Sequence, residues 1–149
     1  MSDYQLVPVV SPEDWAFFHA VRQSELFARR PDIVYDANHP DDRTPRHFPL
    51  LLKFNGKRIG VARLDLLARG AVAMRLVAIE RGEQRKGHGR ALMRVFEDLA
   101  RAKGAIRIFL NAHQSAVGFY ESLGFVRENW VDPAAGSLGD DSVAMSKAI

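Results

Sequence analysis

The chain has 149 residues, 47% apolar and 26% charged, which predicts one soluble globular domain (residues 1–149) without a membrane-spanning helix. It contains no cysteine, which excludes a disulfide framework and a thiol nucleophile. Its first residues lack signal-peptide features, so we expect a cytoplasmic protein with no membrane partner. The net charge of +3 is modest and spread along the chain, so we expect no nucleic-acid partner, although a basic nucleic-acid-binding domain stays open as an alternative.

The first third of the chain predicts a strand, a helix and a long loop. Apolar residues alternate over Tyr4–Val10, as in an edge strand. Ser11 and Pro12 are typical of a helix start, and that helix is expected to reach about Ala28. Residues 29–47 contain three prolines and no periodicity. Loops of that length are uncommon in compact domains and are often functional.

Three strands follow as an antiparallel meander. Phe48–Phe54 and Lys57–Leu67 are joined by Asn55–Gly56, the favoured two-residue hairpin turn. Arg69–Gly70 then turns the chain into Ala71–Ile79. This third strand is apolar on both faces, which predicts a central position in a sheet that is covered on both sides.

A helical crossover connects the next strand. Gly89–Lys103 has an apolar stripe at helical spacing, and Ala105–Ala112 alternates as a strand does. A strand reached through a helix runs parallel to the strand before it, so we expect Ala105–Ala112 to lie parallel to Ala71–Ile79.

The C-terminal part predicts a short helix and a final hairpin. Ser115–Leu123 is the helix, with Ser115 as its cap. Phe125–Val131 and Ser142–Ser146 are the two strands of the hairpin. The predicted fold class is therefore α/β, with a mixed, mostly antiparallel sheet and helices on both faces.

The segment Gln84–Arg90 carries the most specific functional signal. It follows an apolar strand and opens a helix, whose first N–H groups have no partner inside the helix. Gly87 and Gly89 let a phosphate approach the backbone without a side chain in the way. The cations around them add positive charge; these are Arg85, Lys86 and Arg90.

Two common phosphate loops do not fit this segment. Leu92 stands where the dinucleotide fingerprint needs its third glycine, and the Gly-Lys-Ser/Thr end of a Walker loop is absent. The pattern that fits is Gln/Arg-x-x-Gly-x-Gly/Ala, at Gln84, Gly87 and Gly89. On these residues the segment resembles the acetyl-CoA pyrophosphate loop of the GNAT N-acetyltransferase superfamily.

A second segment strengthens this resemblance. Asn111–Phe125 is similar to the GNAT block Asn-x-x-x-x-Ala-x-x-Phe-Tyr-Glu-x-x-Gly-Phe, although Gly118 stands where a bulkier residue is more usual. The two blocks have the expected order and spacing, and together they cover about a third of the chain, Ala73–Val126. The chain is identified on these blocks as a member of the GNAT superfamily.

The resemblance implies a sheet splayed between its two central parallel strands, with acetyl-CoA in the gap and CoA as product. Backbone groups at the end of the first parallel strand would bond the pantetheine arm as a further strand would. The glycine loop would bind the pyrophosphate. The implied cofactor-binding residues are Val77, Ala78, Ile79, Gln84, Arg85, Lys86, Gly87, His88, Gly89, Arg90, Asn111 and Phe119.

Several of these residues have a second interpretation. Arg85 and Lys86 are also typical of solvated surface charge, and the side chain of His88, at a variable position, is expected to be exposed. Asn111 is equally consistent with a residue that ends a strand and leads into a helix. Phe119 has the character of a core aromatic.

Tyr120 is the residue predicted to take part in chemistry. When an amine attacks the thioester, CoA leaves as a thiolate, and a phenol with a pKa near ~10 is protonated at pH 7 and can donate to the sulfur. In the family this tyrosine is the usual general acid. The alternative is a core aromatic beside Phe119.

The general base has no equally clear candidate. Glu80, just past the central strand, lies where GNAT enzymes often keep a carboxylate, and His113 and Asp36 are weaker candidates. Glu80 is equally consistent with a loop carboxylate paired to an arginine. Arg75, inside an apolar strand, must be paired if it is buried; it either binds a substrate carboxylate or covers the sheet.

The sequence therefore predicts direct transfer of an acetyl group to a primary amine of a small molecule or peptide. No histidine or cysteine spacing indicates a metal site, and no Gly-x-Ser-x-Gly elbow is present. A non-catalytic CoA-binding module is the alternative. The acceptor site is expected between Trp15–Ala28, Arg29–His47 and Asn129–Asp141, and dimers are common in the family. Four acids hint at a cationic acceptor, with Arg43 and Arg46 among them: Asp32, Asp36, Asp41 and Asp42.

Overall fold

Seven strands form one mixed sheet in the computed structural model, which describes residues 3–28, 30–133 and 142–149. The strand order is β1-β2-β3-β4-β5-β7-β6, and β4 and β5 form the only parallel pair in the described part of the chain. The strands are β1 (Tyr4–Pro8), β2 (His47–Phe54), β3 (Lys57–Leu66), β4 (Ala71–Ile79), β5 (Arg107–Ala112), β6 (Val126–Arg127) and β7 (Val143–Ala148). The predicted mixed sheet and its parallel pair are confirmed.

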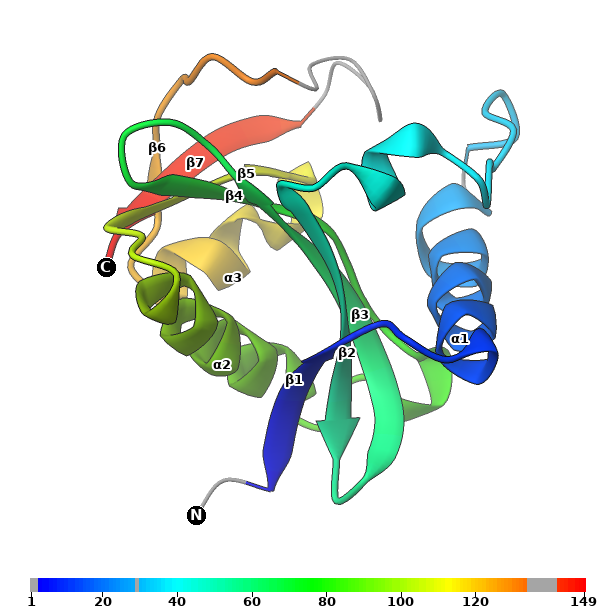
Figure 1. Cartoon of the computed structure of the whole chain (residues 1–149). Helices are drawn as coiled ribbons and strands as arrows, with labels where there is room; N and C mark the ends of the chain where they lie inside the picture. Colours follow the sequence, from blue (N-terminus) through cyan, green and yellow to red (C-terminus); the bar gives the residue numbers. More distant parts are fainter. Residues whose placement is uncertain (1–2, 29, 134–141) are drawn as a thin grey trace.

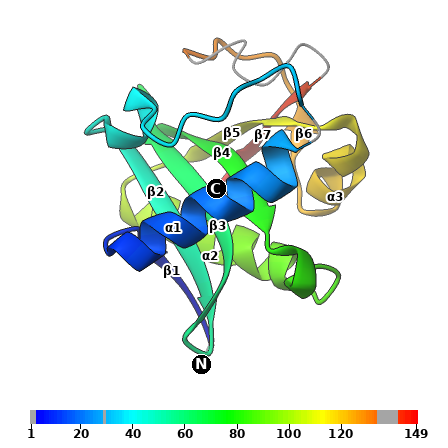
Figure 2. The ribbon, with the colours of Figure 1, turned by 90° about the vertical axis from the view of Figure 1, so that its right-hand side faces the viewer.

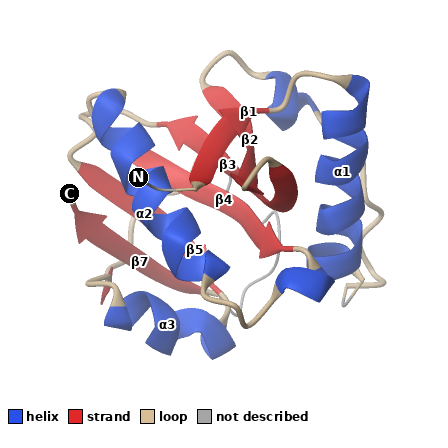
Figure 3. Cartoon of the chain, turned by 90° about the horizontal axis from the view of Figure 1, so that it is seen from below, coloured by secondary structure: helices blue, strands red, loops and turns tan. Residues whose placement is uncertain are grey.

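Helices cover both faces of the sheet (Figures 1 and 3). α1 crosses one face (Figure 2), while α2 and α3 lie on the other. The helices are α1 (Pro12–Arg22), the π-helical turn η1 (Gln23–Phe27), the 3₁₀ turns η2 (Pro40–Arg43), η3 (Arg81–Glu83) and η4 (Gln114–Ala116), α2 (His88–Ala102) and α3 (Val117–Ser122). None of the described helices is long and apolar enough to cross a membrane.

The start of α1 is fixed by a capping box. Ser11 accepts the backbone N–H of Asp14, and the Asp14 carboxylate accepts the N–H groups of Ser11 and Val10. Phe18 and Val21, one turn apart on this helix, are then buried against strands β2 to β4. This smaller core holds α1 over the sheet.

The larger core lies between the sheet and helices α2 and α3. Leu92, Phe96 and Ala100 repeat at four-residue spacing along α2 and are fully buried against the strands. The two predicted tight turns also form: Asn55 and Gly56 both have positive φ, as do Arg69 and Gly70. That conformation is the one that two-residue hairpins favour.

The parallel pair opens after its first three residues. β4 and β5 are bonded only from Ala71–Arg107 to Ala73–Phe109. Leu76 then has φ of 52°, and the register with β3 shifts by one residue there, which is a β-bulge. We call the unpaired edge between β4 residues 74–79 and the end of β5 the seam. The splayed centre expected from the resemblance is therefore present.

Two local predictions at the C-terminal side are wrong. Ser115 does not cap the predicted short helix: His113 caps the turn η4, and α3 begins only at Val117 without a side-chain cap. β6 has two residues instead of seven, because the chain pairs with β7 only at Val126 and Arg127. Most of the predicted loop between β6 and β7, residues 134–141, lies outside the described residues.

Candidate active site

The predicted phosphate loop encloses a pocket of about 290 Å³ at the start of α2. We call it the loop pocket. Its wall contains eight of the residues expected to bind a cofactor: Ile79, Gln84, Arg85, Gly87, His88, Gly89, Arg90 and Phe119. The structure therefore brings together, around one cavity, residues from the end of β4, the loop, the first turn of α2 and α3.

The backbone of this loop fits a phosphate group. Arg85 and Gly87 have positive φ, which turns the chain sharply before α2. A Cβ built on Gly87 would meet nothing within 4 Å, and one on Gly89 would only touch the Phe119 ring at 3.5 Å. The space beside both glycines is therefore open, at the positive end of a 15-residue helix.

One carboxylate shares the loop pocket. Glu83 accepts hydrogen bonds from Lys57 at 2.8 Å and Lys86 at 3.2 Å. These two bonds, led by that of Lys57, lower the pKa of Glu83 to about 2. The charge of Lys86 is therefore engaged, which leaves the backbone amides, Arg85 and Arg90 to face an anion.

The expectation of an exposed His88 side chain is wrong. The residue is buried, with its Nδ1 2.7 Å from the Tyr4 hydroxyl and its ring packed against Phe54. The reason is helical spacing, because His88 lies four residues before the buried Leu92 and shares its face. Only the backbone of His88 is thus suited to a ligand.

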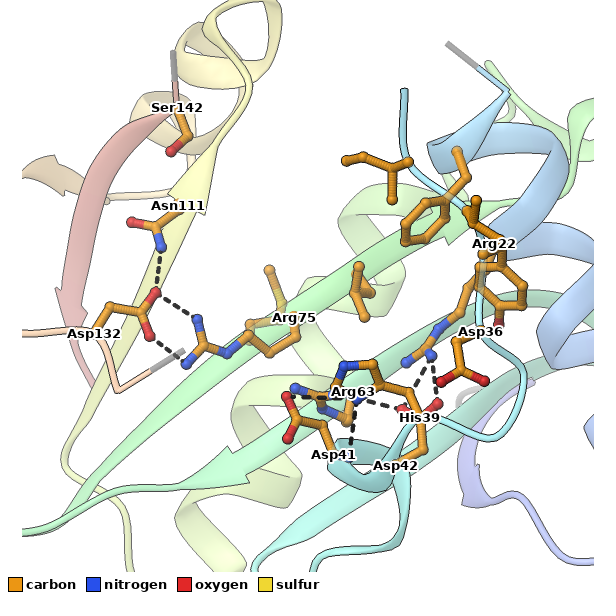
Figure 4. A pocket seen from close by; sticks show the side chains of 16 residues that line it. Arg22, Asp36, His39, Asp41, Asp42, Arg63, Arg75, Asn111, Asp132 and Ser142 are labelled. Carbon is orange, nitrogen blue, oxygen red and sulfur yellow. Dashed lines mark hydrogen bonds and ion pairs between the residues drawn. The ribbon is translucent and has the colours of Figure 1, made fainter. Parts of the chain in front are cut away.

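A second, larger pocket of about 400 Å³ opens on the α1 side of the seam (Figure 4). We call it the arginine pocket, after Arg22, Arg63 and Arg75. Its other lining residues come from η1, the loop after it, β4, β5 and the segment before β7: Phe27, Ile33, Val34, Tyr35, Asp36, His39, Asp41, Asp42, Met74, Leu76, Asn111, Asp132 and Ser142.

Ion pairs join the three arginines into one network, of which Figure 4 draws the contacts made by Asp42 and Asp132 but not Asp65. Asp42 bridges Arg22 and Arg63, with oxygen–nitrogen distances of 2.9 Å and 3.1 Å. Asp65 lies beneath and bridges Arg63 and Arg75, at 2.7 Å and 3.2 Å. The network runs across the pocket from α1 to β4.

At the far side of this network, Arg75 and Asn111 converge on one acid. Asp132 accepts two hydrogen bonds from Arg75, at 2.6 Å and 2.7 Å, and one from the Asn111 amide nitrogen at 2.7 Å. The prediction that Arg75 must be paired is confirmed. Asn111 lies in the arginine pocket and does not line the loop pocket.

The family follows from the sequence match over most of this architecture. Residues 13–125, well over half of the chain, match the acetyltransferase (GNAT) family. The chain belongs to the GNAT acetyltransferase family. Acetyl-CoA as the acyl donor fits this family, and the loop pocket lies where the predicted pyrophosphate loop places it.

Solved structures of GNAT proteins share the whole fold. A putative N-acetyltransferase from Lactobacillus plantarum is 22% identical, with a TM-score of 0.77 and 99% of both chains covered. The ribosomal-protein-S18-alanine N-acetyltransferase from Escherichia coli is 20% identical, with a TM-score of 0.73 over 98% of this chain and 94% of that one. The PaiA N-acetyltransferase from Thermoplasma acidophilum, solved with coenzyme A, is 16% identical, with a TM-score of 0.71 and complete coverage of both.

In this GNAT protein the Tyr120 hydroxyl makes no hydrogen bond among the described residues. The ring packs edge-on against Phe119 and Phe125, and burial raises the pKa of Tyr120 to about 12. The phenol therefore stays protonated at neutral pH. Tyr120 itself lines neither pocket, but its ring packs on Phe119, which lines the loop pocket.

The three candidate bases lie in different places. Glu80 caps the turn η3 after β4, is partly buried, forms no ion pair within the described chain, and lines neither pocket. Asp36 lines the arginine pocket and accepts the backbone N–H of Asn38. His113, beyond β5, is engaged in capping η4.

Sequence reasoning missed the buried ion-pair network and a contact between η1 and the loop pocket. Arg63 and Asp65 are charged residues two apart in an apolar strand, a signal that both face one side and need partners. Glu25, in η1, accepts a hydrogen bond at 2.7 Å from the Gln84 side chain, which also bonds the carbonyl of Ile79. No local pattern indicates that contact.

Proposed function

We propose that this chain is an N-acetyltransferase that moves the acetyl group of acetyl-CoA to a primary amine bound in the arginine pocket. The observation that carries this proposal is the placement of the two pockets along β4. Met74 to Leu76 line the arginine pocket, and Ile79 lines the loop pocket. Only Val77 and Ala78 separate them along the strand, at the open seam.

The residues of the seam and the loop pocket suit an extended donor. The amides at the start of α2 would hold the pyrophosphate, and the free edge of Val77–Ile79 would bond the pantetheine arm as an added strand. Asn111 keeps its carbonyl oxygen for a pantetheine amide, because only its nitrogen bonds Asp132. Acetyl-CoA would supply the thioester carbonyl, and CoA would leave as the thiol.

Tyr120 is proposed to stabilise the leaving sulfur. A phenol with a pKa of about 12 gives up its proton reluctantly to a thiolate whose conjugate acid has a pKa near ~8.5. Hydrogen bonding to the sulfur as negative charge develops is therefore its better role. Glu80 is proposed to take the proton of the attacking amine through water, since its carboxylate is not committed to an ion pair among the described residues.

Transfer is proposed to be direct, in a complex of donor and acceptor. The chain has no cysteine for a covalent intermediate, and the two pockets are separate cavities that can be filled together. The expected acceptor is a small molecule or a peptide, and the working compartment is proposed to be the cytoplasm. The fold alone does not select among acceptors.

The test combines binding with turnover. Excess acetyl-CoA should raise the Tm of the purified protein, because a ligand of the native state stabilises it, and free thiol should appear when amines are added. A Tm rise without thiol release, and without any effect of Tyr120→Phe, would support the non-catalytic module instead. No Tm rise together with salt-dependent DNA binding would support the nucleic-acid alternative.

A further inference from the structure

The three arginines of the arginine pocket differ in how many of their nitrogens are occupied. All three guanidinium nitrogens of Arg63 donate to Asp42 or Asp65, and all three of Arg75 donate to Asp65 or Asp132. The guanidinium groups of Arg63 and Arg75 are therefore fully paired with carboxylates of the protein. They have no strong need for a ligand.

Arg22 is different. Its Nη1 donates to both oxygens of Asp42, at 2.9 Å and 3.0 Å, but Nε and Nη2 are buried and have no hydrogen-bond partner among the described residues. The whole residue is only 2% exposed. A buried donor without a partner is costly, and for a charged group the cost is larger still.

The electrostatics of the three arginines show the same difference. Burial lowers the pKa of Arg22, and its interactions with Asp42 and Tyr35 compensate only in part. For Arg63 and Arg75 burial also acts to lower the pKa, but the bonds to Asp65 and Asp132 outweigh it and the pKa is raised. Arg22 is the member of the network whose positive charge is least compensated.

The position of the guanidinium is set by packing. Its Cζ lies 3.9 Å from the centre of the Phe18 ring, on the same helix, so the plane is held by a cation–π contact. Tyr35, which also lines the pocket, bonds His19 through its hydroxyl and packs on Phe27. Arg22 is the last residue of α1, so its guanidinium lies at the α1 wall of the cavity.

We infer that the Nε–Nη2 edge of Arg22 recognises a carboxylate carried by the amine acceptor; this inference rests on the proposed acetyl transfer. Those two N–H groups are parallel and match the two oxygens of a carboxylate in a bidentate pair. The acceptor class is thus an amine that also bears a carboxylate. Its carbon skeleton would contact the apolar part of the wall, formed by Phe27, Ile33 and Leu76.

The acidic residues of the pocket agree with such an acceptor. Asp42 and Asp132 are occupied by arginines, so they do not attract a cationic ligand. Asp36 and Asp41 stay on the loop wall without an arginine partner among the described residues, so they can attract a cationic amine as it enters the pocket. The acids that suggested a purely cationic acceptor from the sequence are therefore compatible, in the structure, with an acceptor that carries both a positive and a negative charge.

Access to Arg22 requires a small movement of the covering loop. Nε and Nη2 are closed to water in this structure. Within the described chain, the backbone hydrogen bonds of loop residues 30–39 run only to residues of that loop or to its ends at Phe27 and Asp42. The loop can therefore shift without breaking bonds of the sheet.

The test uses CoA derivatives that carry a stand-in for the acceptor. In each compound, the carboxyl group of S-carboxymethyl-CoA is joined to the amine of an ω-amino acid with one to five methylenes; we call these compounds the acids. Each acid has a matched control, called the amide, in which the terminal carboxylate is replaced by a carboxamide. Binding is measured by calorimetry for the wild type, Arg22→Lys and Arg43→Lys. Arg22→Lys keeps a cation beside Asp42 but removes the free edge, and Arg43 is exposed and lines neither pocket.

We expect at least one acid to bind the wild type ~10-fold or more tighter than its amide. Arg22→Lys should remove that difference in affinity, while its affinity for the amides and for CoA itself should equal that of the wild type. Arg43→Lys should bind the acid more tightly than the amide, as the wild type does. Acids and amides that bind within threefold of each other at every length would overturn the inference. A wild type that does not bind CoA would instead overturn the proposed function.

Discussion

At the scale of single residues, Tyr120 has a role that can be separated from folding. Its hydroxyl has no hydrogen-bond partner in the described chain, so Tyr120→Phe removes no internal bond and should leave Tm and CoA affinity unchanged. We expect kcat to fall by about 10²-fold, the usual cost of losing one transition-state donor. Steady-state kinetics at saturating acetyl-CoA measure this. An unchanged kcat would show that Tyr120 is only a core aromatic.

In the phosphate loop, the backbone is expected to contribute more to CoA affinity than the side chains do. Gly89→Val puts carbon atoms into the space beside the first amides of α2, where the structure has only an ordinary contact with Phe119. Arg90→Ala removes a side chain that already donates to Ser122 at 3.0 Å. We expect Gly89→Val to weaken CoA binding by at least ~10-fold and Arg90→Ala by much less. Equal losses by calorimetry would argue against binding through the backbone.

At the scale of elements, the cap of α1 makes the folding stability of the protein depend on pH. The hydrogen bond from Arg58, followed by those from the backbone of Ser11 and Val10, lowers the pKa of Asp14 to about 2. The unfolded value is near 3.8, so this stabilisation is present above pH 4 and is lost as pH falls toward 2. Asp14→Asn should therefore lower stability at pH 7 and flatten its fall between pH 4 and 2.

Urea unfolding at several pH values measures this effect. Glu13→Gln is the matched control, because it changes an exposed acid in the same turn of α1. The control should keep the acid dependence of the wild type. If Asp14→Asn kept it as well, the cap would not be the source of the dependence.

The regular elements could be predicted from the sequence because their signals are local. The Ser11 cap, the Asn55–Gly56 turn and the stripe of α2 each lie within a few residues. The bulge at Leu76 could not be predicted, since a leucine with positive φ has no local signature. The burial of His88 follows from its helical spacing to Leu92, whereas its variable position in the motif indicates exposure.

At the scale of the whole molecule, the two pockets differ in how far the sequence defines them. Most of the loop pocket comes from one continuous segment, so its residues could be named from a motif. The arginine pocket joins Arg22, Arg63, Arg75 and Asp132 from four distant parts of the chain. No local pattern indicates their ion pairs, which only the fold reveals. The residues of the loop pocket could therefore be named from the motif. For the arginine pocket the sequence indicated three of the segments that line it, Trp15–Ala28, Arg29–His47 and Asn129–Asp141, but not the ion pairs.

The seam also predicts which backbone amides exchange more slowly when the donor is bound. In the described chain β5 pairs with β4 only as far as Ala73, so the later β4 edge is open to a ligand. Acetyl-CoA should slow hydrogen exchange in residues 76–81 and 85–91, because a bound pantetheine arm and pyrophosphate would occupy their free amides. Residues 48–54, in β2, pair with β1 and β3 and should exchange at the same rate with and without the ligand.

Hydrogen-exchange mass spectrometry of the intact protein, with free CoA and Gly89→Val as controls, measures these rates. Free CoA should protect the same two segments, since it shares the arm and the phosphates, and Gly89→Val should weaken both effects together. Protection of 85–91 alone would mean that the arm does not follow β4. In that case the bound donor would not extend from the loop pocket to the arginine pocket, and the proposal of acetyl transfer across the seam would be wrong.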